Sequence, residues 1–153
     1  MTKWLSEPQQ KIWRNWLTAT SLLHEQLNTE LQESDGLTMA DYEILVRLSD
    51  TEGRRIRMSD LAELTLSSRS RLTHQVDRME KAGLVKRVAC EDDRRGQHCV
   101  MTDKGWKTLV AAAPHHVESV RKNFVDVLTA EEYAALGRAT AKIAARLSQE
   151  PTK

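Results

Sequence analysis

The side chains best suited to molecular recognition in this chain of 153 residues are gathered in one short segment, 67–78. Leu72, Val76 and Met79 recur at helical spacing and predict a helix with one apolar face over 67–82. The opposite face carries Ser70, Arg71, Thr73, His74, Asp77 and Arg78, with Ser67 at the start. Serine, arginine, threonine and histidine supply donors and acceptors that suit base edges and phosphates. Free N–H groups at the start of the helix also favour a phosphate. The set predicts a nucleic-acid contact, whereas the alternative is an ordinary solvated helix face.

A second basic group follows at Arg94 and Arg95, beside Asp92 and Asp93, in a polar turn that contains Gly96. A protruding turn with arginine can enter the narrow minor groove of DNA, where the potential is most negative. The alternative is that these arginines only pair with the adjacent aspartates. Both can hold, because one pair can stiffen the turn while the other arginine reaches the nucleic acid.

The sequence holds none of the motifs that would predict an enzyme. It lacks a glycine-rich phosphate loop, a G-x-S-x-G and an H-E-x-x-H. His115 and His116 are adjacent, so in a helix they point about 100° apart, and the other histidines are scattered. No ligands converge at the spacing of a metal site. We therefore expect no catalysis, no cofactor and no metal.

Cys90 and Cys99 are the two cysteines, and they lie on either side of the basic turn. A disulfide between them would be a redox switch, because it would lock or distort the turn. Free cysteine is more often a small buried hydrophobe, and we favour that interpretation. The absence of a cysteine framework fits a reducing cytoplasm.

The basic helix must be positioned by the elements around it. Thr38 followed by Asp41 predicts the start of a preceding helix. A short helix opens at Ser59 or its neighbour, a turn at 66–68 leads into the basic helix, and Gly83 closes that helix. The runs LVKRVAC and QHCVMT then predict a β-hairpin, the only β structure expected. This order is the layout of a winged helix–turn–helix.

A long helix predicted over 8–32 precedes this unit. Trp13 and Leu17 widen its apolar surface beyond one face, so more than one side must be buried. A partner subunit is a natural way to bury it. Trp4, Trp13 and Trp16 suit either a dimer interface or an aromatic ligand pocket, and we favour the interface.

Helical patterning resumes after the hairpin and continues to the end of the chain. Pro114 lies inside this region, where we expect a kink or a break. The segment Thr129–Glu132 has the pattern of a capping box and predicts the start of a final helix.

Composition bounds the class of protein. Apolar residues make up 40% and charged residues 29%, which is typical of a globular domain. No apolar run approaches the roughly 20 residues of a membrane span, and the N-terminus lacks a signal-peptide pattern, so we expect a cytoplasmic protein. The net charge is +1, but 54–104 carries 12 basic and 8 acidic side chains. Such a local excess favours a polyanionic partner.

The run LSSRSRLTHQVDRMEKAGLVKR, followed by DDRRGQHCVMTDKG, resembles the MarR family of bacterial transcription regulators. The shared features are D-R-hydrophobic-E before G-L-V, the Asp93-x-Arg95 wing and T-D-x-G. LTMADYEILVRL and LTAEEYAALG resemble flanking helices, so the resemblance covers nearly the whole chain. It implies a homodimer with intertwined terminal helices, bound to a palindromic operator in double-stranded DNA, usually as a repressor. It also implies that a small aromatic or anionic effector releases the DNA.

By position, the resemblance places Ser68, Arg69, Ser70, Arg71, Thr73 and His74 in the recognition helix. It places Arg94 and Arg95 at the tip of the wing. Many members have a small or polar residue at position 71, so Arg71 either changes the sequence that is read or adds a phosphate contact.

We therefore expect a mainly α protein, with a winged helix–turn–helix at 37–104 and dimerisation helices at 1–36 and 105–153. The predicted DNA contacts are Ser67, Ser68, Arg69, Ser70, Arg71, Thr73, His74, Arg78, Arg94 and Arg95. No residue is predicted for an effector site. A second hypothesis is a helical protein–protein interaction module on the same scaffold, since fold does not fix function. Weak retention on heparin that ignores salt would favour it.

Overall fold

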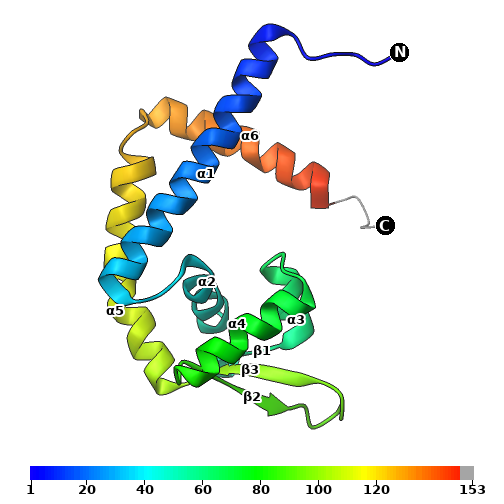
Figure 1. The fold of residues 1–153 in the computed structure, drawn as a ribbon, viewed down its shortest axis with the longest axis vertical. Helices are drawn as coiled ribbons and strands as arrows, with labels where there is room; N and C mark the ends of the chain where they lie inside the picture. Colours follow the sequence, from blue (N-terminus) through cyan, green and yellow to red (C-terminus); the bar gives the residue numbers. More distant parts are fainter. Residues whose placement is uncertain (149–153) are drawn as a thin grey trace.

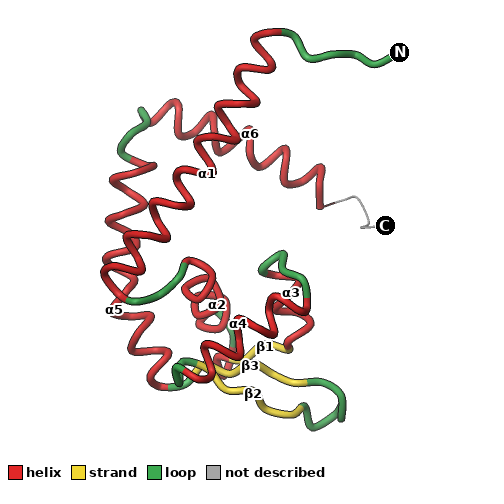
Figure 2. The backbone as a smooth tube through the Cα atoms, viewed as in Figure 1, coloured by secondary structure: helices red, strands yellow, loops and turns green. Residues whose placement is uncertain are grey.

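The computed structural model describes residues 1–148 (Figure 1). In chain order the elements are α1 Glu7–Asp35, α2 Met39–Ser49, the 3-10 turn η1 Glu52–Arg54, β1 Arg55–Arg57, α3 Met58–Leu64, α4 Arg69–Lys81, β2 Val85–Ala89, β3 Gln97–Met101, α5 Asp103–Val120, the π-helical segment η2 Arg121–Val125, and α6 Ala130–Ser148. The fold is mainly helical with one small sheet, as predicted (Figure 2).

Local sequence explains where the central helices begin and end. Thr38 caps α2 by accepting a hydrogen bond from the Asp41 N–H, and Asp41 accepts one in return from the Thr38 N–H. The predicted start of this helix is therefore confirmed, and its cap is a capping box. Gly83 follows α4 with a φ of 76°, a left-handed conformation that glycine adopts without steric cost. The short helix α3 begins at Met58, the neighbour of the predicted start.

The predicted hairpin is confirmed, but it is not the only β structure. Strands β2 and β3 pair antiparallel, with Val85 opposite Met101. A third strand, β1, pairs with the other edge of β3, so the sheet order is β1-β3-β2. The sequence prediction missed β1 because it is three residues long and only Ile56 is buried, which leaves no visible alternation.

The hydrophobic core lies between the sheet and helices α2 to α4. Its most deeply buried side chains are Ile44, Leu45, Leu48, Leu61, Leu72, Val76, Met79, Val85 and Cys99. Leu72, Val76 and Met79 are the three that the sequence assigned to the apolar face of the basic helix. Their burial turns the opposite face of α4 outward.

The start of α5 packs tightly against the base of the hairpin. Gly105 lies so close to this segment that a Cβ atom there would stand 2.1 Å from the Leu84 carbonyl oxygen. The hydroxyl of Thr102 donates to the Gly83 carbonyl at 2.6 Å. Together these contacts fix α5 relative to the hairpin and to the end of α4.

The terminal helices form a second layer beside the core. In Figure 1, α1 runs alongside α5. The expected break at Pro114 is absent, because α5 continues through it to Val120. Pro114 and Val110 lie on the exposed side of α5, so water can reach the carbonyl that loses its donor. The helical ladder changes instead at η2.

Across residues 1–148, no helix is both long enough and apolar enough to cross a membrane.

Candidate nucleic-acid interface

Helix α4 presents the predicted basic and polar side chains to solvent. Ser68 is its N-cap and accepts a hydrogen bond from the Arg71 N–H at 3.2 Å. Leu66, in the turn before it, has a φ of 51° and is 96% exposed. The exposed members of the predicted set are Ser68, Arg69, Ser70, Arg71, Thr73, His74 and Arg78, and Ser67 is half-buried. Helix α4 therefore carries six of the ten predicted contacts, and Ser67 and Ser68 immediately precede it.

Asp77 lies on the predicted polar face but has a different role. The guanidinium of Arg87 on β2 donates to Asp77 at 2.5 Å and to Glu80 at 2.8 Å. The Arg87 backbone N–H also donates to Glu80, and these two bonds lower the pKa of the Glu80 carboxyl. The hydrogen bonds that the Arg87 guanidinium donates to Glu80 and Asp77 raise the pKa of Arg87. The cluster joins helix α4 to strand β2 of the hairpin.

The wing carries its arginines on a turn that is closed by backbone contacts. The Asp93 carboxylate accepts a hydrogen bond from the Arg95 backbone N–H at 3.0 Å, and the Gly96 N–H donates to the Asp93 carbonyl. Asp92 instead accepts from Arg57 on β1. Within residues 1–148, neither Arg94 nor Arg95 forms an ion pair with its neighbouring aspartates. Of the two alternatives at this turn, pairing only with the adjacent aspartates is therefore wrong for the guanidinium groups.

A cleft of about 340 Å³ separates the start of α4 from the wing. It is lined by Arg57, Met58, Ser59, Arg69, Leu72, Thr73, Asp93, Arg95, Gly96 and Gln97. Arg69, Thr73 and Arg95 were predicted contacts, and the structure brings all three to one hollow. Sequence reasoning missed Arg57 and Ser59. Arg57 ends the basic run TEGRRIR at 51–57, whose short strand was not predicted.

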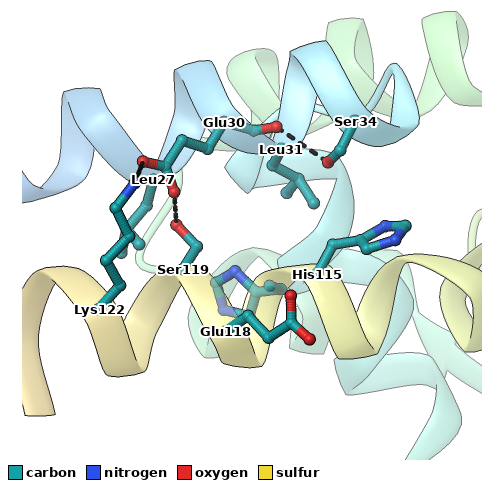
Figure 3. Close-up of a pocket in the computed structure, with 9 residues that line it drawn as sticks. Leu27, Glu30, Leu31, Ser34, His115, Glu118, Ser119 and Lys122 are labelled. Carbon is teal, nitrogen blue, oxygen red and sulfur yellow. Dashed lines mark hydrogen bonds and ion pairs between the residues drawn. The ribbon is translucent and has the colours of Figure 1, made fainter. Parts of the chain in front are cut away.

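A second, polar pocket of about 290 Å³ lies between α1 and α5 (Figure 3). Glu30 on α1 accepts hydrogen bonds from Ser119 and from Gln26, which lower its pKa from 4.5 to about 2. Lys122 stands 3.4 Å from the same carboxylate. The pocket therefore has a fixed negative group at one end and a lysine beside it.

Two histidines line the other end of this pocket. His115 Nδ1 lies 3.0 Å from the Asp35 carboxylate at the end of α1. The ring of His116 packs on Tyr42 of α2, with 4.5 Å between centroids. Its Nδ1 is buried without a hydrogen-bond partner among the described residues, and burial lowers the pKa of His116. This end of the pocket is therefore lined by α1 and α5, and His116 connects it to α2.

Both cysteines are free and buried. Cys90 Sγ lies 3.1 Å from His98 Nδ1 beneath the wing turn. Cys99 belongs to the core, and burial raises its pKa to about 12. The interpretation as small buried side chains is confirmed. In the part of the chain that the structure describes, no three His, Cys, Asp or Glu side chains converge as metal ligands.

A helix–turn–helix whose second helix is followed by a hairpin wing defines the winged-helix class. The MarR family profile matches residues 37–96. AbsC, a MarR family transcriptional regulator from Streptomyces coelicolor, is 50% identical, with a TM-score of 0.91 over 97% of this chain and all of that chain. The chain belongs to the MarR family of transcriptional regulators.

Two further relatives bear on function. Sco3205, a MarR family regulator from Streptomyces coelicolor solved in complex with DNA, is 38% identical, with a TM-score of 0.91 over 99% of this chain and 94% of that chain. The transcriptional repressor MprA of Escherichia coli is 30% identical over 120 residues, or 78% of this chain and 68% of that protein. These relatives are transcriptional regulators rather than enzymes.

Proposed function

We propose that the protein is a cytoplasmic, homodimeric repressor that binds a palindromic operator in double-stranded DNA. Helix α4 enters the major groove, and the wing directs Arg94 and Arg95 to a minor groove. The observation that carries this proposal is the outward face of α4, where arginine, serine, threonine and histidine side chains stand exposed. The DNA complex of Sco3205 supports the same assignment.

The dimer is supported by apolar side chains that the single chain leaves exposed. On α1 these are Ile12, Trp13, Trp16, Leu17 and Leu22; on α5 and α6 they are Val110, Val117, Tyr133, Ile143 and Leu147. A groove of about 430 Å³ between α1, η2 and α6 is lined mostly by apolar residues. We assign residues 1–36 and 105–153 to dimerisation and residues 37–104 to DNA binding. We propose that a second copy of the chain occupies the groove.

The pocket between α1 and α5 is where we place the effector. It is lined by α1, α5 and η2 of the proposed dimerisation region, and the ring of His116 packs on Tyr42 of α2 in the proposed DNA-binding region. The two histidine rings with Leu27 and Leu31 suit a small aromatic molecule, whereas the carboxylates of Glu30 and Glu118 disfavour an anion. Binding that spreads α5 from α2 would change the separation of the two recognition helices and release the DNA.

The experiment is selection of bound fragments from a random duplex library by the purified protein. We expect enrichment of an inverted repeat whose half-sites lie about 10 base pairs apart, because two symmetric recognition helices must fit successive major grooves. Absence of any enriched sequence, with the protein recovered as a complex with another protein, would favour the interaction-module hypothesis instead.

A further inference from the structure

The cleft between α4 and the wing is lined by arginine residues from three separate elements. Arg57 comes from the end of β1, Arg69 from the first turn of α4 and Arg95 from the wing. Asp93 is the one carboxylate that lines the cleft, and it already accepts the Arg95 backbone N–H at 3.0 Å. The cleft therefore carries an excess of positive charge.

The neutral side chains of the cleft add hydrogen-bonding capacity to this charge. Ser59 and Gln97 line it beside the arginines. The Thr73 hydroxyl donates to the Arg69 carbonyl at 2.8 Å, so its proton is already engaged within α4. A hollow with several guanidinium donors and little opposing charge suits a single tetrahedral anion.

Arg57 is held at the edge of this cleft by a partner that it can exchange. Its Nη2 stands 2.7 Å from Asp92 Oδ2, with 37% of the Arg57 side chain and 72% of the Asp92 side chain exposed. An ion pair this open to water contributes little free energy. Arg57 can therefore transfer its hydrogen bonds from a solvated carboxylate to a phosphate at small cost.

We propose that this cleft binds one backbone phosphodiester of the DNA, that Arg57 is a ligand of that phosphate, and that Asp92 is a positioning residue that holds Arg57 ready. The inference rests on the proposed function and adds to it a contact that reads charge rather than sequence. A phosphate contact fixes the register of the protein on the duplex without distinguishing bases.

The test is the salt dependence of DNA affinity for Arg57→Ala, measured by fluorescence anisotropy on the selected operator and on a scrambled duplex. We expect the affinity for both duplexes to fall by a similar factor, about tenfold at low salt, because the lost contact is to the backbone. The slope of log affinity against log salt should become shallower by about 1.8, because the bound dimer loses one phosphate contact from each of its two subunits. An unchanged slope would overturn the proposal even if affinity fell.

Two matched variants test whether Arg57 binds a phosphate or only stabilises the wing through its ion pair with Asp92. Arg57→Lys keeps the charge, so it should retain the wild-type slope with a smaller loss of affinity. Asp92→Asn keeps an acceptor oxygen that positions Arg57 and removes a negative charge beside the DNA, so it should bind DNA at least as tightly as the wild type. If Asp92→Asn weakened binding as much as Arg57→Ala, the pair would be a brace and the proposal would be wrong.

Two further measurements distinguish a DNA phosphate from free phosphate, and distinguish failure of this inference from failure of the proposed function. Inorganic phosphate, compared with chloride at equal ionic strength, should not displace the DNA; specific displacement that Arg57→Ala abolishes would make the cleft a site for the free anion. A wild-type protein that binds no DNA would contradict the proposed function itself. If the wild type binds DNA and Arg57→Ala binds it with the same affinity and the same salt slope, only this inference is contradicted.

Discussion

The guanidinium of Arg87 on β2 lies 2.8 Å from Glu80 on α4, and the Arg87 backbone N–H donates to the same carboxylate. The Glu80 side chain on α4 therefore accepts hydrogen bonds from both the backbone and the side chain of Arg87 on β2. The two DNA-contacting elements of the proposed interface are thus joined directly, with Asp77 as a second anchor. The two acidic residues of the D-R-hydrophobic-E pattern, Asp77 and Glu80, both bind Arg87 of the wing.

Arg87→Ala should loosen this junction. We expect the free energy of unfolding to fall by about 1 kcal/mol, since the pairs are partly exposed but share one well-ordered guanidinium. Chemical denaturation measures it. Arg47→Ala, which removes an exposed pair with Glu43 on α2, is the control and should cost less than half as much. Equal effects of the two variants would contradict a special role for Arg87.

Arg69→Ala and Arg71→Ala test the recognition helix. Each should weaken operator binding by about 1–3 kcal/mol if the side chain reaches a base edge, with relaxed preference at that base pair. Anisotropy against operator variants with single substitutions measures both quantities. Arg138→Ala, on α6 away from the proposed interface, is the control. Wild-type affinity in the double variant would refute the assignment of α4 to the major groove.

Arg95→Ala tests the wing. Its guanidinium lines the cleft while its backbone N–H closes the turn, so the substitution keeps the turn and removes the charge. We expect weaker binding and a shallower salt slope, because a positive charge near the phosphates is lost. Affinity and slope that both match the wild type would count against any contact between the wing and DNA.

Gly105→Ala tests the packing of α5 against the hairpin. The new methyl group would stand 2.1 Å from the Leu84 carbonyl oxygen, a backbone atom that cannot rotate away. We expect a loss of about 1–3 kcal/mol in the free energy of unfolding, from overpacking. Gly137→Ala is the matched control on α6, where nothing lies within 4 Å, and it should stabilise the helix slightly. A neutral Gly105→Ala in thermal unfolding would show that the close approach is not kept in solution.

Stability should fall as the solution is acidified, in two steps with separate causes. Burial lowers the pKa of His116, so the unfolded chain binds a proton first and stability declines below pH 6.5, the ordinary value. The pKa of Glu30 is lowered from 4.5 to about 2, so its contribution is present above pH 4.5 and is lost between these two values.

Thermal unfolding from pH 7.5 to pH 3 measures both steps, with variants that assign them. His116→Gln should flatten the curve near pH 6, and Glu30→Gln should flatten it below pH 4.5 while lowering stability at neutral pH. The ring of His116 packs on Tyr42 from α2, and Asp35 at the end of α1 pairs with the adjacent His115. A wild-type profile in either variant would show that the named group is not the one that titrates.

The sequence predicts most where the physical cause is local. The Thr38 capping box, the glycine after α4 and the apolar face of that helix each depend on residues within a few positions, and the structure has all three. Strand β1 depends on pairing with a distant strand, and its single buried residue leaves no periodicity to read. Local patterning alone therefore could not reveal it.

In the candidate site, too, features set by local sequence could be predicted, whereas features set by long-range pairing could not. Helical geometry alone exposes Arg69, Arg71 and His74 together. Asp77 lies on the same face, yet its role is set by Arg87, which is ten residues away on another element. Arg57 joins the cleft only because β1 pairs with β3, and its partner Asp92 is 35 residues away. Long-range pairing decides which polar residues position the interface and which are free to bind.

The central claim is that the chain is a sequence-specific DNA-binding regulator, and fluorescence anisotropy tests it most directly. The purified protein is titrated into labelled DNA from upstream of its own gene, at two salt concentrations and with excess scrambled duplex. We expect tight binding that persists in the presence of the competitor DNA and weakens steeply with salt, because phosphate contacts release counterions. Binding no tighter than to scrambled DNA, both there and on every fragment recovered from a genome-wide selection, would contradict it.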